Sequence, residues 1–247
     1  MADNKAMQAG PAAGEPVATA TGGFARSLYE IFTDPAKVFA RIDEGLSWWK
    51  PFIVVTAISI AIGFVIMPFR NQAMMPALQK LPPEQMERSI AQMKAWAPVA
   101  LIMIPIFTII VLLITAGIMH IFVNIMSSRA HFKKTMSLLV WCGFISLVEQ
   151  VIATAIIAGK GVESIESFAD LKMSIGPAAL VPDASGALEA LLQSFSLFQI
   201  WYYVVLVLGV AAIFKLRRAQ AVVPVVPIWL ITFVLLLIGS KSQGAMG

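Results

Sequence analysis

The sequence contains few of the residues that carry most enzyme chemistry. Its 247 positions hold one cysteine, two histidines and only 13% charged residues. A lone cysteine excludes a disulfide within the chain, and Cys142, inside an apolar run, is interpreted as a small packing residue. Neither His120 nor His131 has a cysteine or an acid at metal-ligand spacing. We therefore predict no catalytic residues, no metal site and no bound cofactor.

Longer functional motifs are missing too. The sequence has no glycine-rich phosphate loop, no His-Glu-x-x-His, no Cys-x-x-Cys and no nucleophile elbow. Its net charge of +4 is modest, and Lys and Arg lie at the ends of apolar runs rather than in a basic cluster with aromatics between them. We expect a protein that is not an enzyme and does not bind nucleic acid.

Apolar residues, in contrast, are abundant. They make up 59% of the chain, with a mean hydropathy of +0.82, whereas soluble domains are about half apolar and about a quarter charged. Since about 20 apolar residues cross a bilayer as a helix, the runs predict an all-α membrane bundle of five transmembrane helices with short amphipathic interfacial helices. The predicted spans are 51–69, 97–126, 135–159, 194–214 and 219–239.

Residues 1–23 have a different composition. Alanine, glycine, proline and threonine dominate this stretch, and it has almost no bulky apolar residues. Such a segment cannot bury a core, so we expect a disordered tail. No apolar core of a signal peptide follows the start, and residues 24–247 are expected to form the five-span domain.

A short amphipathic helix is predicted before the first span. Asp34-Pro35 resembles a helix start, and Val38, Phe39 and Ile42 follow at helical spacing. The helix leads into Trp48-Trp49, which suits the headgroup region of a membrane. The pattern favours a helix on the membrane surface; the alternative is a helix packed on the chain's own cytoplasmic loops.

Two long loops and several prolines shape the rest of the chain. Pro82-Pro83 introduces an amphipathic helix in the loop 70–96, and the stretch 187–195 looks helical in the loop 160–193. Pro98 and Pro105 in the second span predict a kink.

The distribution of basic residues predicts the orientation. Loop 127–134 and turn 215–218 contain Lys and Arg but no acids, whereas loop 160–193 is acidic. Positive-inside counting puts the N-terminus in the cytoplasm and the C-terminus outside. We expect a multi-pass membrane protein, in contact with membrane lipids and with protein partners or further copies of itself.

Glu149 is the one acid predicted within a span. A carboxyl at such depth is costly and suggests a functional site, and Gln199, Tyr202 and Tyr203 on the fourth span reach similar depths. Three interpretations stay open. In the first, Glu149 hydrogen-bonds helices together; in the second, it serves a proton- or substrate-linked role; in the third, it lies near the outer interface because the third span is shorter than 135–159.

The order and spacing of several motifs resemble the Yip-domain membrane proteins, a five-span family named for interaction with Ypt/Rab GTPases. The stretches that carry the resemblance are Asp34 to Ile42 with Trp48-Trp49, Pro82 to Met86, Phe132 to Leu138, Phe195 to Trp201, and Gly209 with the turn from Arg218 to Ala221. The resemblance covers about residues 25–238.

The resemblance implies five spans and, from eukaryotic relatives, an adaptor role in membrane trafficking. The short N-terminal tail is more similar to the bacterial members, which implies a bacterial cytoplasmic (inner) membrane. The leading hypothesis is a membrane scaffold or adaptor that organises lipids or protein partners, as in trafficking or remodelling. The alternative is a small transporter or channel that uses Glu149.

Overall fold

A computed structural model describes residues 23–171, 176–181, 184 and 186–244, with side chains to residue 239. The expected disordered tail, apart from Gly23, lies outside these residues. The described chain is helical and has no strand. Its helices are α1 (Phe24–Thr33), α2 (Pro35–Asp43), α3 (Trp49–Leu78), α4 (Pro83–Met126), α5 (Phe132–Lys160), α6 (Gly186–Gln193), α7 (Leu197–Phe214), α8 (Arg218–Val222) and α9 (Val226–Gly244). Three short 3₁₀ turns, η1 (Val162–Ser164), η2 (Phe168–Leu171) and η3 (Pro177–Leu180), lie between α5 and α6.

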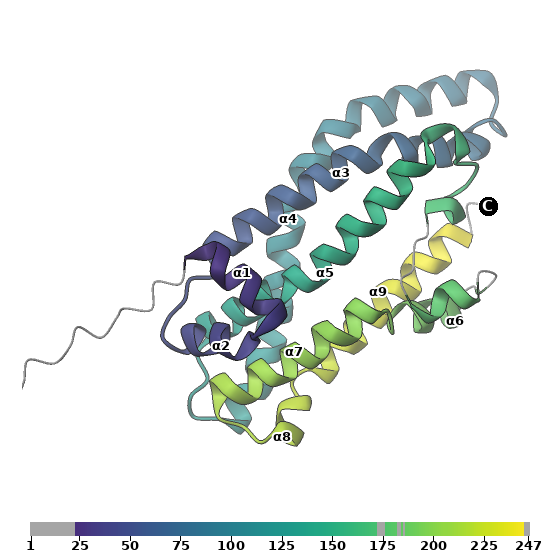
Figure 1. Ribbon diagram of the computed structural model, residues 1–247. Coiled ribbons are helices and arrows are strands. Elements are labelled where there is room, and N and C mark those ends of the chain that lie inside the picture. Colours follow the sequence, from purple (N-terminus) through teal and green to yellow (C-terminus); the bar gives the residue numbers. More distant parts are fainter. Residues whose placement is uncertain (1–22, 172–175, 182–183, 185, 245–247) are drawn as a thin grey trace, which may run out of the picture.

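Five segments are long and apolar enough to cross a membrane, which confirms the predicted fold class. They are Trp49–Leu78, Pro83–Met126, Phe132–Lys160, Leu197–Phe214 and Arg218–Gly239. Figure 1 shows them as an elongated bundle with α1 and α2 at one end, and the α3–α4 connection with the end of α9 at the other. Helix α5 packs against α3, α4 and α7, so it forms the centre of the bundle.

The helices of the first two spans, α3 and α4, are longer than the spans predicted for them. Helix α3 continues to Leu78, and the amphipathic segment after Pro83 joins the second span in one helix of 44 residues. Pro98 and Pro105 lie inside this helix without ending it. In Figure 1, α4 runs beside α3 and then turns toward the centre of the bundle.

The last predicted span, 219–239, consists of two helices, α8 and α9, rather than one. A turn around Pro224 separates α8 from α9, because proline cannot donate the backbone hydrogen bond that a helix interior needs. The predicted helix near 187–195 is present as α6 and packs along α9.

The apolar face of α2 is covered by protein. Val38, Phe39 and Ile42 are each at most 2% exposed, and α2 packs on α7 and α5. The membrane-surface position that the sequence favours is therefore wrong for this face. The alternative was right that α2 packs within the chain, but its partners are spanning helices rather than loops.

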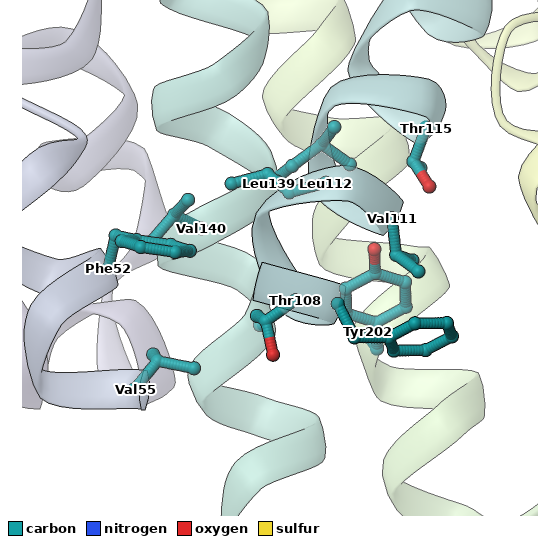
Figure 2. A pocket seen from close by; sticks show the side chains of 11 residues that line it. Phe52, Val55, Thr108, Val111, Leu112, Thr115, Leu139, Val140 and Tyr202 are labelled. Carbon is teal, nitrogen blue, oxygen red and sulfur yellow. The ribbon is translucent and has the colours of Figure 1, made fainter. Parts of the chain in front are cut away.

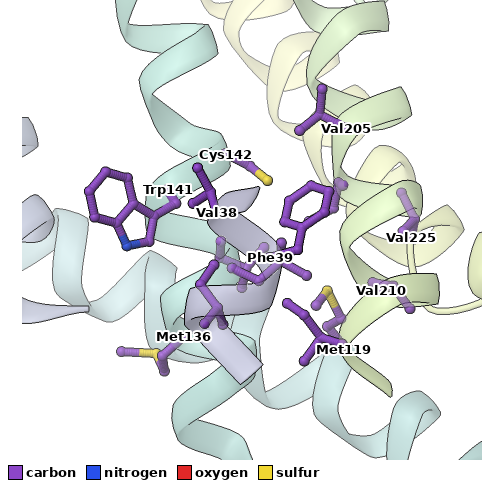
Figure 3. Close-up of a cluster of buried hydrophobic side chains, with 14 of the residues drawn as sticks. Val38, Phe39, Met119, Met136, Trp141, Cys142, Val205, Val210 and Val225 are labelled. Atoms are coloured by element: carbon purple, nitrogen blue, oxygen red, sulfur yellow. The ribbon is translucent and has the colours of Figure 1, made fainter. Parts of the chain in front are cut away.

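Two apolar clusters hold the bundle together. The larger one joins α2, α4, α5, α7 and α9, and Figure 3 shows part of it around Phe39 and Met119. The smaller one lies at the opposite end, where Phe69 and Ala73 of α3 meet Ile157 of α5 and Ile165 beyond η1. This second cluster fixes the extended end of α3 to the end of α5.

Candidate functional sites

Glu149 lies level with the start of α7. It is 17 residues beyond the first residue of α5, or about 26 Å along the helix. Its carboxylate lies beside the hydroxyl of Ser196. That hydroxyl caps α7 by accepting a hydrogen bond from the backbone N–H of Gln199 at 3.1 Å. From Glu149, α5 continues for 11 residues to Lys160, so Glu149 lies nearer the Lys160 end of this helix than its Phe132 end.

Gln199 and Tyr203 extend the same polar cluster along α7. The Tyr203 hydroxyl lies near the side chains of Gln199 and of Thr232 on α9, but it makes no hydrogen bond of ordinary geometry. The cluster thus joins α5, α7 and α9 near one end of the bundle. Its chemistry suits hydrogen bonding between helices.

Two members of this cluster, Ser196 and Thr232, were not among the predicted site residues. The pattern Ser196-x-x-Gln199 is typical of a helix N-cap and would have located the start of α7. A span drawn from residue 194 hides that signal, because it places Ser196 inside the helix.

Tyr202 faces away from the cluster into a separate cavity. Successive helical residues point about 100° apart, so Tyr202 and Tyr203 serve different neighbours although their ring centroids are 5.2 Å apart. The cavity of about 330 Å³ lies between α3, α4, α5 and α7. Figure 2 shows Tyr202 and Thr108 among apolar side chains at its wall.

The cavity has little polar chemistry. The Thr108 hydroxyl donates to the carbonyl of Ile104 at 2.7 Å, which leaves Tyr202 and Thr115 as the other hydroxyls in the wall. No acid lines it, and Glu149 is not among its wall residues. The arrangement can hold an apolar chain. It does not connect the four predicted site residues into one site.

Phe39 of α2 is a central packing residue at its end of the bundle. Its ring lies against Gly209 of α7, where an added Cβ would be 2.9 Å from the ring and 2.4 Å from Leu138 Cδ1. Only a glycine lets α2 approach α7 this closely. Figure 3 shows the ring of Phe39 among buried side chains of the neighbouring helices.

Ion pairs fix α1 and α2 to each other. The Arg41 guanidinium pairs with Glu30 and donates to the Ser27 hydroxyl at 2.6 Å, and Arg26 pairs with the same carboxylate at 2.9 Å. Burial raises the pKa of Glu30, but the hydrogen bonds and charges of Arg41 and Arg26 outweigh it and lower that pKa below its ordinary value.

A second set of ion pairs ties α2 to the spanning helices. Asp43 lies 2.5 Å from Lys134 at the start of α5 and 3.7 Å from Lys215 after α7. The hydrogen bond from Lys134 lowers the pKa of Asp43; burial opposes this, and the positive charges of Lys134, Lys215 and Arg129 add to the lowering. The Ser137 hydroxyl also donates to the carbonyl of Leu46 at 2.9 Å. Helix α2 is therefore held by packing and by charge.

Within the described residues, no three His, Cys, Asp or Glu side chains form a group that could hold a metal ion. His120 packs edge-on against Phe132 with ring centroids 5.6 Å apart, and Cys142 is buried in the larger apolar cluster.

Comparison with known proteins decides the family. The model of the Yip1 domain matches residues 29–239. The chain belongs to the Yip1 domain family. A curated relative is "Membrane protein YknW" of Bacillus subtilis (strain 168), which is 28% identical over 187 residues, covering 74% of this chain and 76% of that protein. No solved structure matches. The family that the sequence motifs suggest is thus confirmed.

Proposed function

We propose that this Yip1-family membrane protein is a scaffold or adaptor that organises protein partners or lipids in a bacterial inner membrane. It does so without catalysis, and the α1–α2 pair presents the binding surface on the cytoplasmic side. The observation that carries the proposal is the rigid docking of α1 and α2. Their buried apolar side chains pack on α5 and α7, the Arg41–Glu30 pair joins the two helices to each other, and Asp43 pairs with Lys134 at the start of α5.

A docked pair of this kind leaves a preformed outer surface. Tyr29 is 69% exposed on α1, and Lys37 on α2 pairs with its neighbour Asp34 at 2.8 Å. Tyrosine is enriched at protein interfaces, and a surface that is already ordered loses less entropy when it binds. These features support partner binding better than transport, because transport requires helices that change position.

The distribution of charge supports a cytoplasmic placement of this surface. Lys134, Lys215, Arg217 and Arg218 cluster at the ends of α5 and α7, next to α2. An excess of Lys and Arg in short loops marks the cytoplasmic side.

The test is native co-purification of the full-length protein from its source membrane, with bound proteins and lipids identified by quantitative mass spectrometry. The variant is Tyr29→Ala, and the matched control is Leu180→Ala, which removes a side chain that is 84% exposed at the end of η3. A protein partner anchored on Tyr29 should be lost from the first variant and kept in the second. Identical protein and lipid sets from the parent and Tyr29→Ala would contradict the proposed platform.

A further inference from the structure

A groove of about 260 Å³ lies between α3 and α4, apart from the cavity beside Tyr202. At its inner end, α3 and α4 approach each other closely: a Cβ on Gly63 would lie 2.8 Å from the side chain of Ile104. From Gly63 the groove follows α3 past Arg70 and Asn71, and α4 past Ala100 and Trp96. Gly63 and Arg70 are seven residues apart, about 10 Å along the helix.

The groove crosses a boundary of the bilayer. Helix α3 has no charged residue between Lys50 and Arg70, and α4 has none after Lys94. The edge of the hydrocarbon therefore runs near Arg70 and Trp96. Trp96 is 64% exposed, as suits an indole at the headgroup level. The groove thus has a polar rim at the headgroups and an apolar floor inside the hydrocarbon.

Arg70 is available at this rim. It makes no ion pair with any side chain in the described part of the chain. It is also one of the basic residues on the side that charge counting assigns to the outside, where Lys and Arg are disfavoured. A guanidinium fork matches the oxygens of a phosphate group, and the neighbouring Asn71 amide can donate a further hydrogen bond.

We propose that this groove binds one phospholipid. Its phosphate lies on Arg70 and Asn71, and part of an acyl chain lies along the floor between Gly63 and Ala100. The inference goes beyond the proposed function, since it concerns the opposite end of the bundle and stands whether or not α1 and α2 bind a partner. A second copy of the chain or a partner helix would not need a lone cation at the headgroup level.

The test is native mass spectrometry of the full-length protein in a neutral detergent, titrated with dioleoyl phosphatidylglycerol. Dioleoylglycerol has the same chains without the phosphate, and inorganic phosphate supplies the anion without the chains. Arg70→Gln removes the charge, and Ala100→Leu fills the floor of the groove. Arg88→Gln, on the part of α4 before the groove, is the matched control. Thermal melting of each variant checks that it stays folded.

We expect Arg70→Gln to bind phosphatidylglycerol about tenfold more weakly than the parent, as for a lost hydrogen bond to a charged group. Ala100→Leu should also weaken binding, and Arg88→Gln should not. Dioleoylglycerol and inorganic phosphate should bind the parent less tightly than the phospholipid. Equal loss in Arg70→Gln and Arg88→Gln, equal binding of dioleoylglycerol, or a dimer that Ala100→Leu dissociates would each overturn the proposal.

Discussion

Replacing Gly209 with alanine should loosen α2 from the bundle. The added methyl group would lie 2.4 Å from Leu138 Cδ1 and 2.9 Å from the Phe39 ring. Neither side chain has room to move, because Leu138 is fully buried and Phe39 is 2% exposed. The strain should therefore fall on the weaker element, the nine-residue α2, rather than on the spanning helices.

The magnitude follows from two opposing effects. Alanine is favoured over glycine inside a helix by about 1 kcal/mol, whereas overpacking a core costs about 1–3 kcal/mol. Gly117→Ala on α4 is the matched control, because a Cβ there meets no atom within 4 Å. Both variants gain the helix term, so the difference between their free energies of unfolding isolates the contact. We expect that difference to be about 1–3 kcal/mol.

Hydrogen exchange followed by mass spectrometry measures the loosening within α2 itself. Gly209→Ala should speed amide exchange across residues 35–43 by about tenfold, since 1.4 kcal/mol is a factor of ten in the opening equilibrium. In a Phe39→Ala background, Gly209→Ala should lower the free energy of unfolding by less, because the aromatic ring that the added methyl group contacts is absent. Equal exchange in Gly209→Ala and Gly117→Ala would refute the docking of Phe39 on Gly209.

Three further predictions concern charge and orientation. Asp43 has a folded pKa below its unfolded value of about 3.9, so its contribution to stability is present above that value and lost as pH falls through the folded pKa. The protection factors of α2, which correct for the intrinsic pH dependence of amide exchange, should thus fall below about pH 4. Asp43→Asn should already lower the free energy of unfolding by about 1 kcal/mol at pH 7, and protection factors in α2 that stay unchanged from pH 7 to pH 3 would contradict the Lys134 pairing. Glu149→Gln should keep its melting temperature, and reconstituted vesicles should show no proton uptake with either protein; uptake in the parent that vanishes in the variant would favour the transporter. Alkaline phosphatase fused after Lys241 should be active and green fluorescent protein fused after Arg218 should fluoresce, and the reverse for both fusions would invert the orientation.

The spans could be predicted from the sequence because length and hydropathy are properties of each segment alone. What covers an apolar face is a different question. Val38, Phe39 and Ile42 form the face that a surface helix would show to lipid, and lipid tails are as apolar as protein side chains. The amphipathic pattern of residues 35–46 therefore cannot tell lipid from α7. The signal for the docking lies 170 residues away in Gly209, whose missing Cβ makes room for the Phe39 ring.

The candidate site around Glu149 could also be predicted only in part from the sequence. The depth of Glu149 could be estimated from helical rise, and the structure places Ser196 beside it, with Gln199 and Tyr203 following along α7. Tyr202 was assigned to the same group because it lies at the same depth. Depth along an antiparallel pair does not fix rotation about the helix axis, and rotation sends Tyr202 into the cavity instead.

The most apolar span is also the least buried one, and the least apolar span is the most buried. The most apolar span is in α4, with a mean hydropathy of 2.9, and α5 reaches only 1.9. Yet α4 buries only Ala116, Met119 and Val123, whereas α5 buries the whole stretch Thr135–Cys142. The hydrophobic effect does not drive spanning helices together within a bilayer. Small and polar residues therefore gather in the interior of the bundle, and the most apolar helix faces the lipid. The polar Thr135 and Ser137 thus mark α5 as the centre of the bundle, and the exposed apolar flank of α4 is the surface on which a lipid or a second protein would act.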